Sequence, residues 1–403
     1  MKDNQAKYPQ LRFKGFVNPW EQRTLGDLGS VEMNRRIFKE QTSEEGDVPF
    51  YKIGTFGGQP DAFITRDLFE EYKRKYSYPK VGDLLISASG SIGRIVQYTG
   101  KDEYFQDSNI VWLEHGSELD NAFLKQFYLI AKWNGIEGTT IKRLYNKIIL
   151  NTKITLPSFP EQKQIGLFLG KLDSTIALHQ RKLAKLKELK QGYLQKLFPK
   201  NGSKFPQLRF SGFADAWEQR KLGTIYDFGK GKGLPLDSFI YSSNNPAIAY
   251  GHLYTKYSEV ISEVFWSSND NGVLSKDNDL LFPGSSTVPN GTAQANAITL
   301  NNVKLGGDII IGRPKEGVGV LSTFMSYQVN SQRQKLFPIT VGTTITHMYG
   351  KDISKLNFFI TDYSEQEKIA SFFKQLDNTI VLHQRKLEKL QELKKGYLQK
   401  MFC

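Results

Sequence analysis

The chain of 403 residues has one cysteine, Cys403, and only five histidines. A single thiol excludes both an internal disulfide framework and a cysteine-rich metal site. The sequence also lacks an apolar run of membrane-spanning length, and its first residues, MKDNQAKYPQ, lack the apolar core of a signal peptide. We therefore expect a soluble, cytoplasmic protein that makes no membrane contact.

Two segments of the chain occur twice. Residues 8–23, which include YPQLRF and WEQR, return 197 positions later at 205–220. Residues 161–198 return 204 positions later at 365–402, and 25 of the 38 aligned positions are identical. A period near 200 residues indicates a duplicated domain, because solenoid and propeller repeats are much shorter. Since the stretches between these shared segments have diverged, the pattern predicts one frame that carries two specificities.

The net charge of +13 is concentrated in the repeated segments. Residues 161–198 hold 8 basic and 3 acidic side chains, and residues 365–402 hold 8 and 5. Residues 20–160 hold 18 basic and 19 acidic side chains, and residues 215–364 hold 13 of each. Basic frames are typical of proteins that touch phosphates without reading sequence, and equally of solvated lysine-rich helix faces.

The repeated blocks predict two long helices with heptad seams. Each block of about 38 residues would extend roughly 57 Å as a helix. An apolar stripe of this length needs a partner, and the matching pattern favours an intramolecular coiled coil of the two copies. The histidines of the seam have no carboxylate or cysteine beside them at metal-ligand spacing, so we interpret them as seam or flank residues. The seam positions are Leu172, Ile176, His179, Leu183, Leu186, Lys190, Tyr193 and Leu197, and then Leu376, Ile380, His383, Leu387, Leu390, Lys394, Tyr397 and Met401.

The pairing direction decides the architecture. A parallel pair would place both divergent regions at one end of the coil. An antiparallel pair would place them at opposite ends, related by a pseudo-twofold axis, and would act as a ruler between two modules.

The divergent regions have the pattern of mixed, β-rich domains. Residues 81–98 alternate and break at Gly90 and Gly93, which predicts two strands joined by a tight turn, and residues 108–114 predict another strand. Residues 278–287 are a fainter echo of the first pattern.

A Gly-Thr-Thr segment closes both divergent regions. Residues 138–148 and 342–352 share it at the same offset of 204. Its backbone N–H groups and hydroxyls could face a phosphate, and a structural turn before the last strand is an equal alternative.

As a set, these motifs resemble the specificity subunit of Type I restriction–modification systems. The resemblance covers essentially the whole chain, including the WEQR opening and the GDLLIS stretch, although the second half departs from GDLLIS at Pro283 and Gly284. The helix lead-in of that family matches Glu161, Gln162, Ile165, Phe168, Leu169, Leu172 and Asp173, and again Glu365, Gln366, Ile369, Phe372, Phe373, Leu376 and Asp377.

The resemblance implies an α+β protein with an internal pseudo-twofold repeat. Two β-rich mixed target-recognition domains, 1–160 and 205–364, would be separated by an antiparallel coiled coil of two long helices, 161–204 and 365–403. Each domain would read one half of an interrupted site in double-stranded DNA. The coil would set the spacer and dock two modification (methyltransferase) subunits, with restriction and motor subunits in the full complex. S-adenosylmethionine, ATP and Mg²⁺ would be used by those other subunits, and this chain would bind no cofactor or metal.

Two motifs suggest catalysis or nucleotide binding and are weak. Asp61 with Glu71 and Lys73 fits the loose spacing of a nuclease, but residues 67–75 have the pattern of a charged helix, and the second half has no equivalent. The run Gly229–Gly233 lacks the GK[ST] ending of a phosphate-binding loop, and we interpret it as a flexible turn. We therefore expect a non-catalytic subunit.

Direct reading of DNA needs polar side chains on loops that enter the major groove. The candidates from the first half are Lys73, Arg74, Lys75, Ser87, Ser89, Ser91, Arg94, Lys142 and Arg143. Those from the second half are Ser285, Ser286, Thr287, Arg313, Lys315, Thr343, Thr344 and His347. Two other functions stay open on the sequence, a self-sufficient restriction endonuclease and a coiled-coil assembly scaffold. The DNA sequence and the spacer length cannot be derived.

Overall fold

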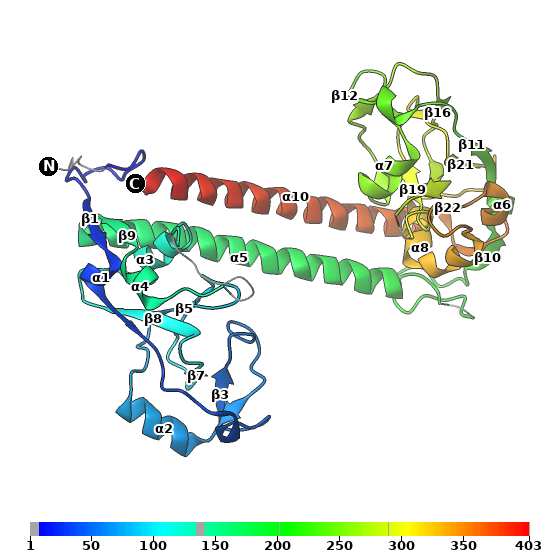
Figure 1. Cartoon of the computed structure of the whole chain (residues 1–403). Coiled ribbons are helices and arrows are strands. Elements are labelled where there is room, and N and C mark those ends of the chain that lie inside the picture. Colours follow the sequence, from blue (N-terminus) through cyan, green and yellow to red (C-terminus); the bar gives the residue numbers. More distant parts are fainter. Residues whose placement is uncertain (1–7, 134–141, 201, 289, 403) are drawn as a thin grey trace. The chain divides into compact units, whose positions relative to one another are not determined.

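The computed structural model describes residues 8–133, 142–200, 202–288 and 290–402 (Figure 1). The two long helices are α5 (Phe159–Lys196) and α10 (Tyr363–Met401). Both begin two residues before the predicted starts at Glu161 and Glu365. The chain forms two compact units, and the division falls inside both helices, after Gln180 and after Arg385. Each unit therefore contains one divergent region, the beginning of the helix that follows it and the end of the other helix.

The first unit is built on a four-stranded antiparallel sheet with the order β2-β8-β5-β6. A smaller sheet, β4-β3-β7, has a separate core with α2. The predicted strands in 81–98 and 108–114 are confirmed as β5, β6 and β8. The elements before α5 are β1 (Glu21–Thr24), α1 (Leu25–Leu28), β2 (Gly29–Glu32), β3 (Val48–Tyr51), β4 (Phe63–Ile64), α2 (Arg66–Lys75), β5 (Leu84–Ser87), β6 (Ile95–Gln97), β7 (Tyr104–Phe105), β8 (Ile110–His115), α3 (Asn121–Tyr128), α4 (Asn146–Leu150) and β9 (Lys153–Leu156).

The second unit has a five-stranded mixed sheet with the order β11-β21-β17-β19-β14. Strand β17 is the counterpart of β5, as the fainter echo in 278–287 predicted. The larger elements are β10 (Glu218–Lys221), α6 (Leu222–Ile225), β11 (Tyr226–Lys230), α7 (Tyr250–Thr255), β17 (Asp279–Pro283), β19 (Asn296–Ile298), β21 (Ile309–Pro314), α8 (Ser322–Ser331), α9 (Gly350–Ile353) and β23 (Asn357–Ile360). The short strands are β12 (Ile240–Tyr241), β13 (Ala247–Ile248), β14 (Val260–Ile261), β15 (Trp266–Ser267), β16 (Val273–Leu274), β18 (Ser285–Ser286), β20 (Lys304–Leu305) and β22 (Thr346–His347).

The WEQR motif is structural in both units. Its strand, β1 or β10, pairs antiparallel with the strand just before the long helix, β9 or β23. The motif's tryptophans, Trp20 and Trp217, are 4% and 1% exposed. The motif therefore fastens the beginning of each divergent region to its end.

An arginine of each LRF motif binds a glutamate of the EQ motif at the start of the long helix. Glu161, which is fully buried, accepts hydrogen bonds from Nε and Nη2 of Arg12 at 2.6 and 2.8 Å. Glu365 and Arg209 repeat this bidentate pair at 2.7 and 2.8 Å. Burial makes such an ion pair depend on good geometry, which the planar guanidinium supplies. The repeated LRF and EQ motifs are thus two halves of one contact.

The two long helices run antiparallel within each unit. In the first unit, Phe168 lies against Tyr397 at 5.0 Å between ring centroids, and Asp173 is paired with Lys394. In the second, Tyr193 lies against Phe372 at 5.0 Å. Among these contacting pairs, the residue numbers rise along α5 as they fall along α10, so the antiparallel alternative is confirmed. None of the twelve apolar and tyrosine seam positions is exposed, namely Leu172, Ile176, Leu183, Leu186, Tyr193, Leu197, Leu376, Ile380, Leu387, Leu390, Tyr397 and Met401.

The end of the partner helix completes the core of each unit. In the first unit, Phe402 stacks on Phe123 of α3 at 5.1 Å between ring centroids. In the second unit, Phe198 takes the same place against Phe324 of α8 at 5.5 Å. Each unit therefore needs residues from both halves of the sequence.

Candidate nucleic-acid interface

In each unit, the turn after the central strand meets the segment that follows Gly-Thr-Thr. In the second unit, β18 pairs with β22, which sets Ser285 opposite His347. The hydroxyl of Ser285 donates to Oδ2 of Asp308 at 3.1 Å. We call Ser285, Asp308 and His347 the second polar junction.

The first unit has the same arrangement with different side chains. An isolated antiparallel bridge joins Ser89 to Arg143. The hydroxyl of Ser89 donates to Oδ1 of Asn109 at 2.7 Å, and the N–H of Leu144 donates to the carbonyl of Ala88 at 2.8 Å. Ser89, Asn109 and Arg143 form the first polar junction.

A shared aspartate explains why the two sequences converge on one local structure. Asp83 accepts a hydrogen bond from the N–H of Lys80 at 2.7 Å, and Asp279 accepts one from the N–H of Lys276 at 2.8 Å. Each bond closes the turn that leads into the central strand. The departure of the second half from GDLLIS thus changes side chains beyond this turn and keeps the backbone plan.

Cationic groups surround the second polar junction. Nζ of Lys230 lies 2.8 Å from Oδ1 of Asp308, and this hydrogen bond is the main reason that the pKa of Asp308 lies below its usual value. A hollow of about 530 Å³ adjoins the pair and is also lined by His347, Tyr349 and Lys351. Because Lys230 and Lys351 are exposed, their ammonium groups are available to an anion such as a phosphate.

The Gly229–Gly233 run is not the flexible turn that we predicted. Its first two residues belong to β11, and the N–H of Gly231 donates to the carbonyl of Ile309 at 2.8 Å. A Cβ atom on Gly231 would lie 1.9 Å from the carbonyl oxygen of Gly306, and Gly233 has a φ of +63°. The glycines therefore permit a close backbone approach.

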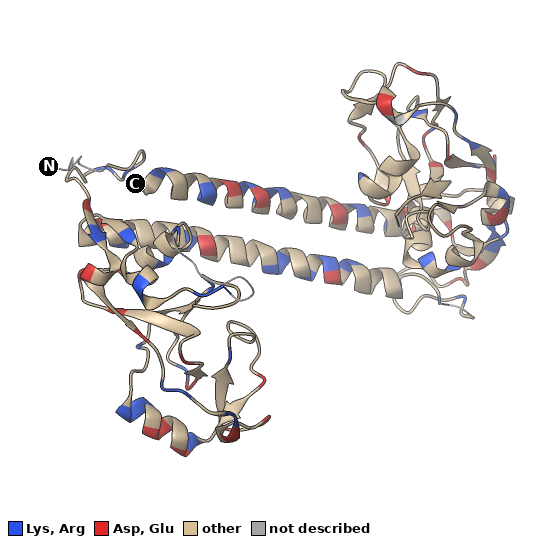
Figure 2. Cartoon of the chain, in the orientation of Figure 1, with Lys and Arg blue, Asp and Glu red and all other residues tan. Residues whose placement is uncertain are grey.

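The candidates on α2 lie apart from the first polar junction, in the smaller lobe. Figure 2 shows both basic and acidic residues on this helix, which confirms the predicted charged helix. Nζ of Lys73 lies 3.5 Å from Oδ1 of Asp102, and Nζ of Lys75 lies 2.7 Å from Oε1 of Glu71. These exposed ion pairs, together with exposed Arg74, form a basic last turn of α2.

Several serine and arginine candidates have structural partners. Ser87 is 1% exposed, donates to the carbonyl of Ser91 and accepts from the N–H of Arg94 at 2.8 Å. Nη1 of Arg94 donates to the carbonyl of Phe56 at 2.7 Å. Of this group only Ser91 and Arg94 are exposed at the surface, as are Lys142 and Arg143.

The second-half candidates fall into two groups. Ser286 is 1% exposed and donates to the carbonyl of Val288 at 3.0 Å, whereas Thr287, Thr343 and Thr344 are exposed near the second polar junction. The two basic candidates lie at the far end of β21 from Asp308. Nε of Arg313 donates at 2.9 Å to Oδ1 of Asp279, which is fully buried, and Nζ of Lys315 donates to the carbonyl of Gly223 at 2.9 Å.

Four basic residues escaped the sequence reasoning. They are Lys230 and Lys351 beside the second polar junction, and Arg35 and Arg36 in the segment that follows β2. The arginines are exposed and lie over the rings of Tyr76 and Phe38. The available signal was basic residues shortly after β2, at the end of β11 and in α9, just after the second Gly-Thr-Thr segment. The first Gly-Thr-Thr sequence, 138–140, lies outside the described residues.

The suggested nuclease residues are not assembled. Asp61 pairs with Lys52 at 2.9 Å, whereas Glu71 and Lys73 have separate partners on and near α2. Within the described part of the chain, no cluster of three or more His, Cys, Asp or Glu residues could hold a metal ion. None of the helices described combines the length and apolarity that a bilayer crossing requires.

Comparisons with known proteins agree with this arrangement. The family described as "Type I restriction modification DNA specificity domain" matches residues 18–188 and 214–392. A putative Type I restriction enzyme specificity subunit of Haemophilus influenzae is 56% identical over 37% of this chain and 39% of its own length. The putative MjaX specificity subunit of Methanocaldococcus jannaschii is 24% identical over 93% of this chain and 91% of its own length.

The fold also has a solved counterpart. The crystal structure of the S subunit of a Type I restriction–modification system from M. genitalium has a TM-score of 0.65 at 16% sequence identity, over 98% of this chain and 99% of that one. The two family matches cover both units and most of the sequence. The chain therefore belongs to the family of Type I restriction–modification specificity subunits, with two copies of the domain that recognises DNA sequence.

Proposed function

We propose that each unit reads one half of an interrupted DNA site through its polar junction. The observation that carries this proposal is one backbone arrangement built twice with different side chains, Ser89, Asn109 and Arg143 in one unit and Ser285, Asp308 and His347 in the other. Arginine offers two parallel donors to a guanine edge, whereas histidine and aspartate present other donor and acceptor patterns. Two similar frames with different junction side chains fit two different half-sites.

The frame has a separate role in this proposal. The antiparallel helices set the number of base pairs between the half-sites and dock two modification subunits, and the restriction and motor subunits join the full complex. S-adenosylmethionine, ATP and Mg²⁺ belong to those partners, and this chain acts in the cytoplasm without catalysis. The separate ion pairs of Asp61, Glu71 and Lys73 disfavour a nuclease in this chain.

The decisive experiment is methylation-motif sequencing of cells that carry this chain with its partner subunits. We expect an interrupted, asymmetric motif. A single uninterrupted motif would contradict the division of reading between two units.

Variants of the junctions then test the residues. We expect Arg143→Ala to relax one base of one half-site by about 1 to 3 kcal/mol and His347→Ala to act only on the other half-site. Lys153→Ala, at an exposed position on β9, serves as the matched control and should leave both half-sites unchanged. If a junction variant instead weakens DNA binding equally at all sequences, the residue contacts phosphates and does not read a base.

A further inference from the structure

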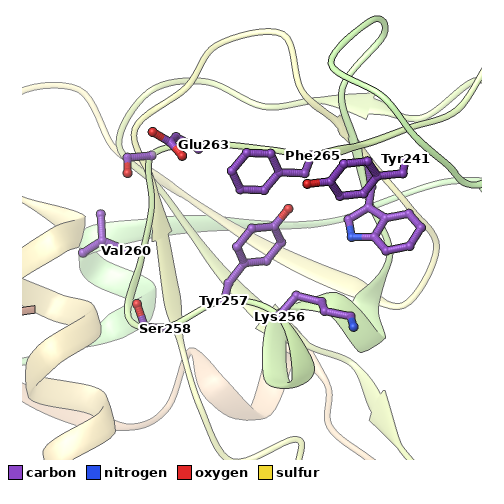
Figure 3. Close-up of a pocket in the computed structure, with 9 residues that line it drawn as sticks. Tyr241, Lys256, Tyr257, Ser258, Val260, Glu263 and Phe265 are labelled. Atoms are coloured by element: carbon purple, nitrogen blue, oxygen red, sulfur yellow. The ribbon is translucent and has the colours of Figure 1, made fainter. Parts of the chain in front are cut away.

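The second unit carries an aromatic hollow that shares no lining residue with the hollow beside the second polar junction. It has a volume of about 350 Å³ and is lined by four aromatic side chains and Glu263 (Figure 3). Tyr241 and Trp266 belong to the paired strands β12 and β15, Phe265 precedes Trp266, and Tyr257 follows α7. We call Tyr241, Tyr257, Phe265 and Trp266 the aromatic cage.

The rings stand in two orientations nearly at right angles. Tyr241 and Phe265 are almost parallel, with an interplanar angle of 11° and 6.2 Å between centroids. Tyr241 and Trp266 are nearly perpendicular, at 87° and 5.8 Å. Figure 3 shows the hydroxyl of Tyr257 pointing toward the Phe265 and Tyr241 side chains. Ring faces in two orientations can surround a group that stacks on an aromatic plane.

Two of the four cage residues are exposed, whereas Tyr257 and Trp266 are half-buried. Tyr241 is 74% exposed and Phe265 is 45% exposed, and the adjoining Ile240 is 60% exposed. Large exposed side chains that line a hollow, here Tyr241 and Phe265, are typical of a surface that a ligand or partner covers.

The local charge selects a cation as the occupant. Between residues 237 and 270 the chain has four acidic residues and one basic residue, and one of the acids, Glu259, is already paired with Lys190. Asp237, Glu263 and Asp270 remain against Lys256 alone, although the net charge of the whole chain is +13. Glu263 lies on the rim of the cage. Burial lowers the pKa of His252, which stacks behind Trp266, and so favours the neutral form of this ring, which does not oppose a cation. DNA phosphates would meet an acidic segment here.

We propose that the aromatic cage binds an arginine side chain of a protein partner. A planar guanidinium stacks on ring faces and is more weakly hydrated than an ammonium, and Glu263 can pair with it. The unit's partner would therefore present an exposed arginine to this hairpin. This contact is separate from DNA reading and would bring a protein to the second unit alone, because the residues of β12 and β15 belong to a divergent region.

Lys256 provides a test of the sign of the charge. It is exposed and also lines the hollow, so its ammonium opposes a cationic ligand. Replacing Lys256 with alanine should tighten the binding of a cation and weaken the binding of a nucleic acid. Replacing Glu263 with glutamine should do the reverse.

The measurement uses the full chain labelled with ¹⁵N-tryptophan, which gives one indole N–H resonance for each of its five tryptophans. N-acetyl-arginine amide is titrated in, with N-acetyl-lysine amide and a single-stranded oligonucleotide as the alternative probes. Trp266→Phe assigns the relevant resonance. We expect the arginine probe to shift this resonance alone, Glu263→Gln and Tyr241→Ala each to weaken binding by about three- to tenfold, and Lys256→Ala to strengthen it.

Matched controls separate the site from general charge effects. Glu316→Gln and Tyr363→Ala change an exposed acid and an exposed tyrosine elsewhere in the second unit, and should leave the arginine titration unchanged. Three results would overturn the proposal. They are an unshifted Trp266 resonance, equal binding of the lysine probe, and oligonucleotide binding that Lys256→Ala weakens.

Discussion

Removing Lys190 from the middle of the second unit should destabilise it markedly. Nζ of Lys190 lies 2.8 Å from a carboxylate oxygen of Glu259 and 2.7 Å from one of Asp377. The three side chains are between 14% and 19% exposed, so one cation compensates two largely buried anions. The hydroxyl of Tyr327 also donates to Asp377 at 2.7 Å. This triad joins both long helices to the divergent region.

The magnitude follows from the two ion pairs. Each hydrogen bond between charged groups contributes about 1.5 to 3 kcal/mol, and removal of one partner of a buried pair costs roughly 3 to 5 kcal/mol. Remaining water access lowers the expected value, because solvent screens the carboxylates that are left. We therefore expect Lys190→Met to lower the free energy of unfolding by about 3 kcal/mol.

The equivalent lysine of the first unit is the control. Lys394 pairs with a single carboxylate, Asp173, which is 33% exposed. Lys394→Met should therefore cost less than half as much. Urea denaturation measures the free energy of unfolding of each variant, and hydrogen exchange locates the loss in the second unit. Equal losses, or a stable Lys190→Met protein, would show that the triad does not carry this energy.

The triad also predicts a pH dependence. Burial is the main cause that raises the pKa of Asp377 above its ordinary value of 3.8. The folded state therefore binds this proton more tightly than the unfolded state, and the stabilisation that it provides is lost as the pH rises from 3.8 through the raised pKa. Asp377→Asn should remove this part of the slope. An identical slope in the variant would refute the assignment.

Three further predictions concern the helices. Leu183→Asp or Leu387→Asp would bury a charge, because each leucine is only 7% exposed, and should cost several kcal/mol of stability and the docking of partner subunits. Thermal unfolding and complex assembly measure these two effects, and unchanged values would contradict a seam that faces inward. A fragment that ends near Lys204 should dimerise and methylate an interrupted palindrome, because each unit is completed by the end of a like helix; a fragment that sedimentation shows to be monomeric at micromolar concentration would refute this. Four residues inserted after Leu186 and four after Leu390 should lengthen the helix pair by about 6 Å. The optimum gap between the two half-sites should then grow by one or two base pairs. Methylation measured across a series of gap lengths tests this, and an unchanged optimum would show that the helices do not set the distance.

The sequence by itself determined the duplicated frame. The heptad spacing predicted both long helices, since a long apolar stripe must be covered. The alternation in residues 81–98 predicted β5 and β6, because side chains of a strand point to alternate faces. The set of short motifs was also specific enough to identify the family.

Contacts between distant segments were decided only by the tertiary structure. Arg12 and Glu161 are 149 positions apart, and no local pattern shows that their motifs form one ion pair. Chain spacing likewise left the pairing direction of the helices open until Phe168 was found beside Tyr397. The polar junctions were also decided by contacts between distant segments. Ser285, Asp308 and His347 meet through strand pairing and side-chain geometry, which the propensities of the individual residues do not encode.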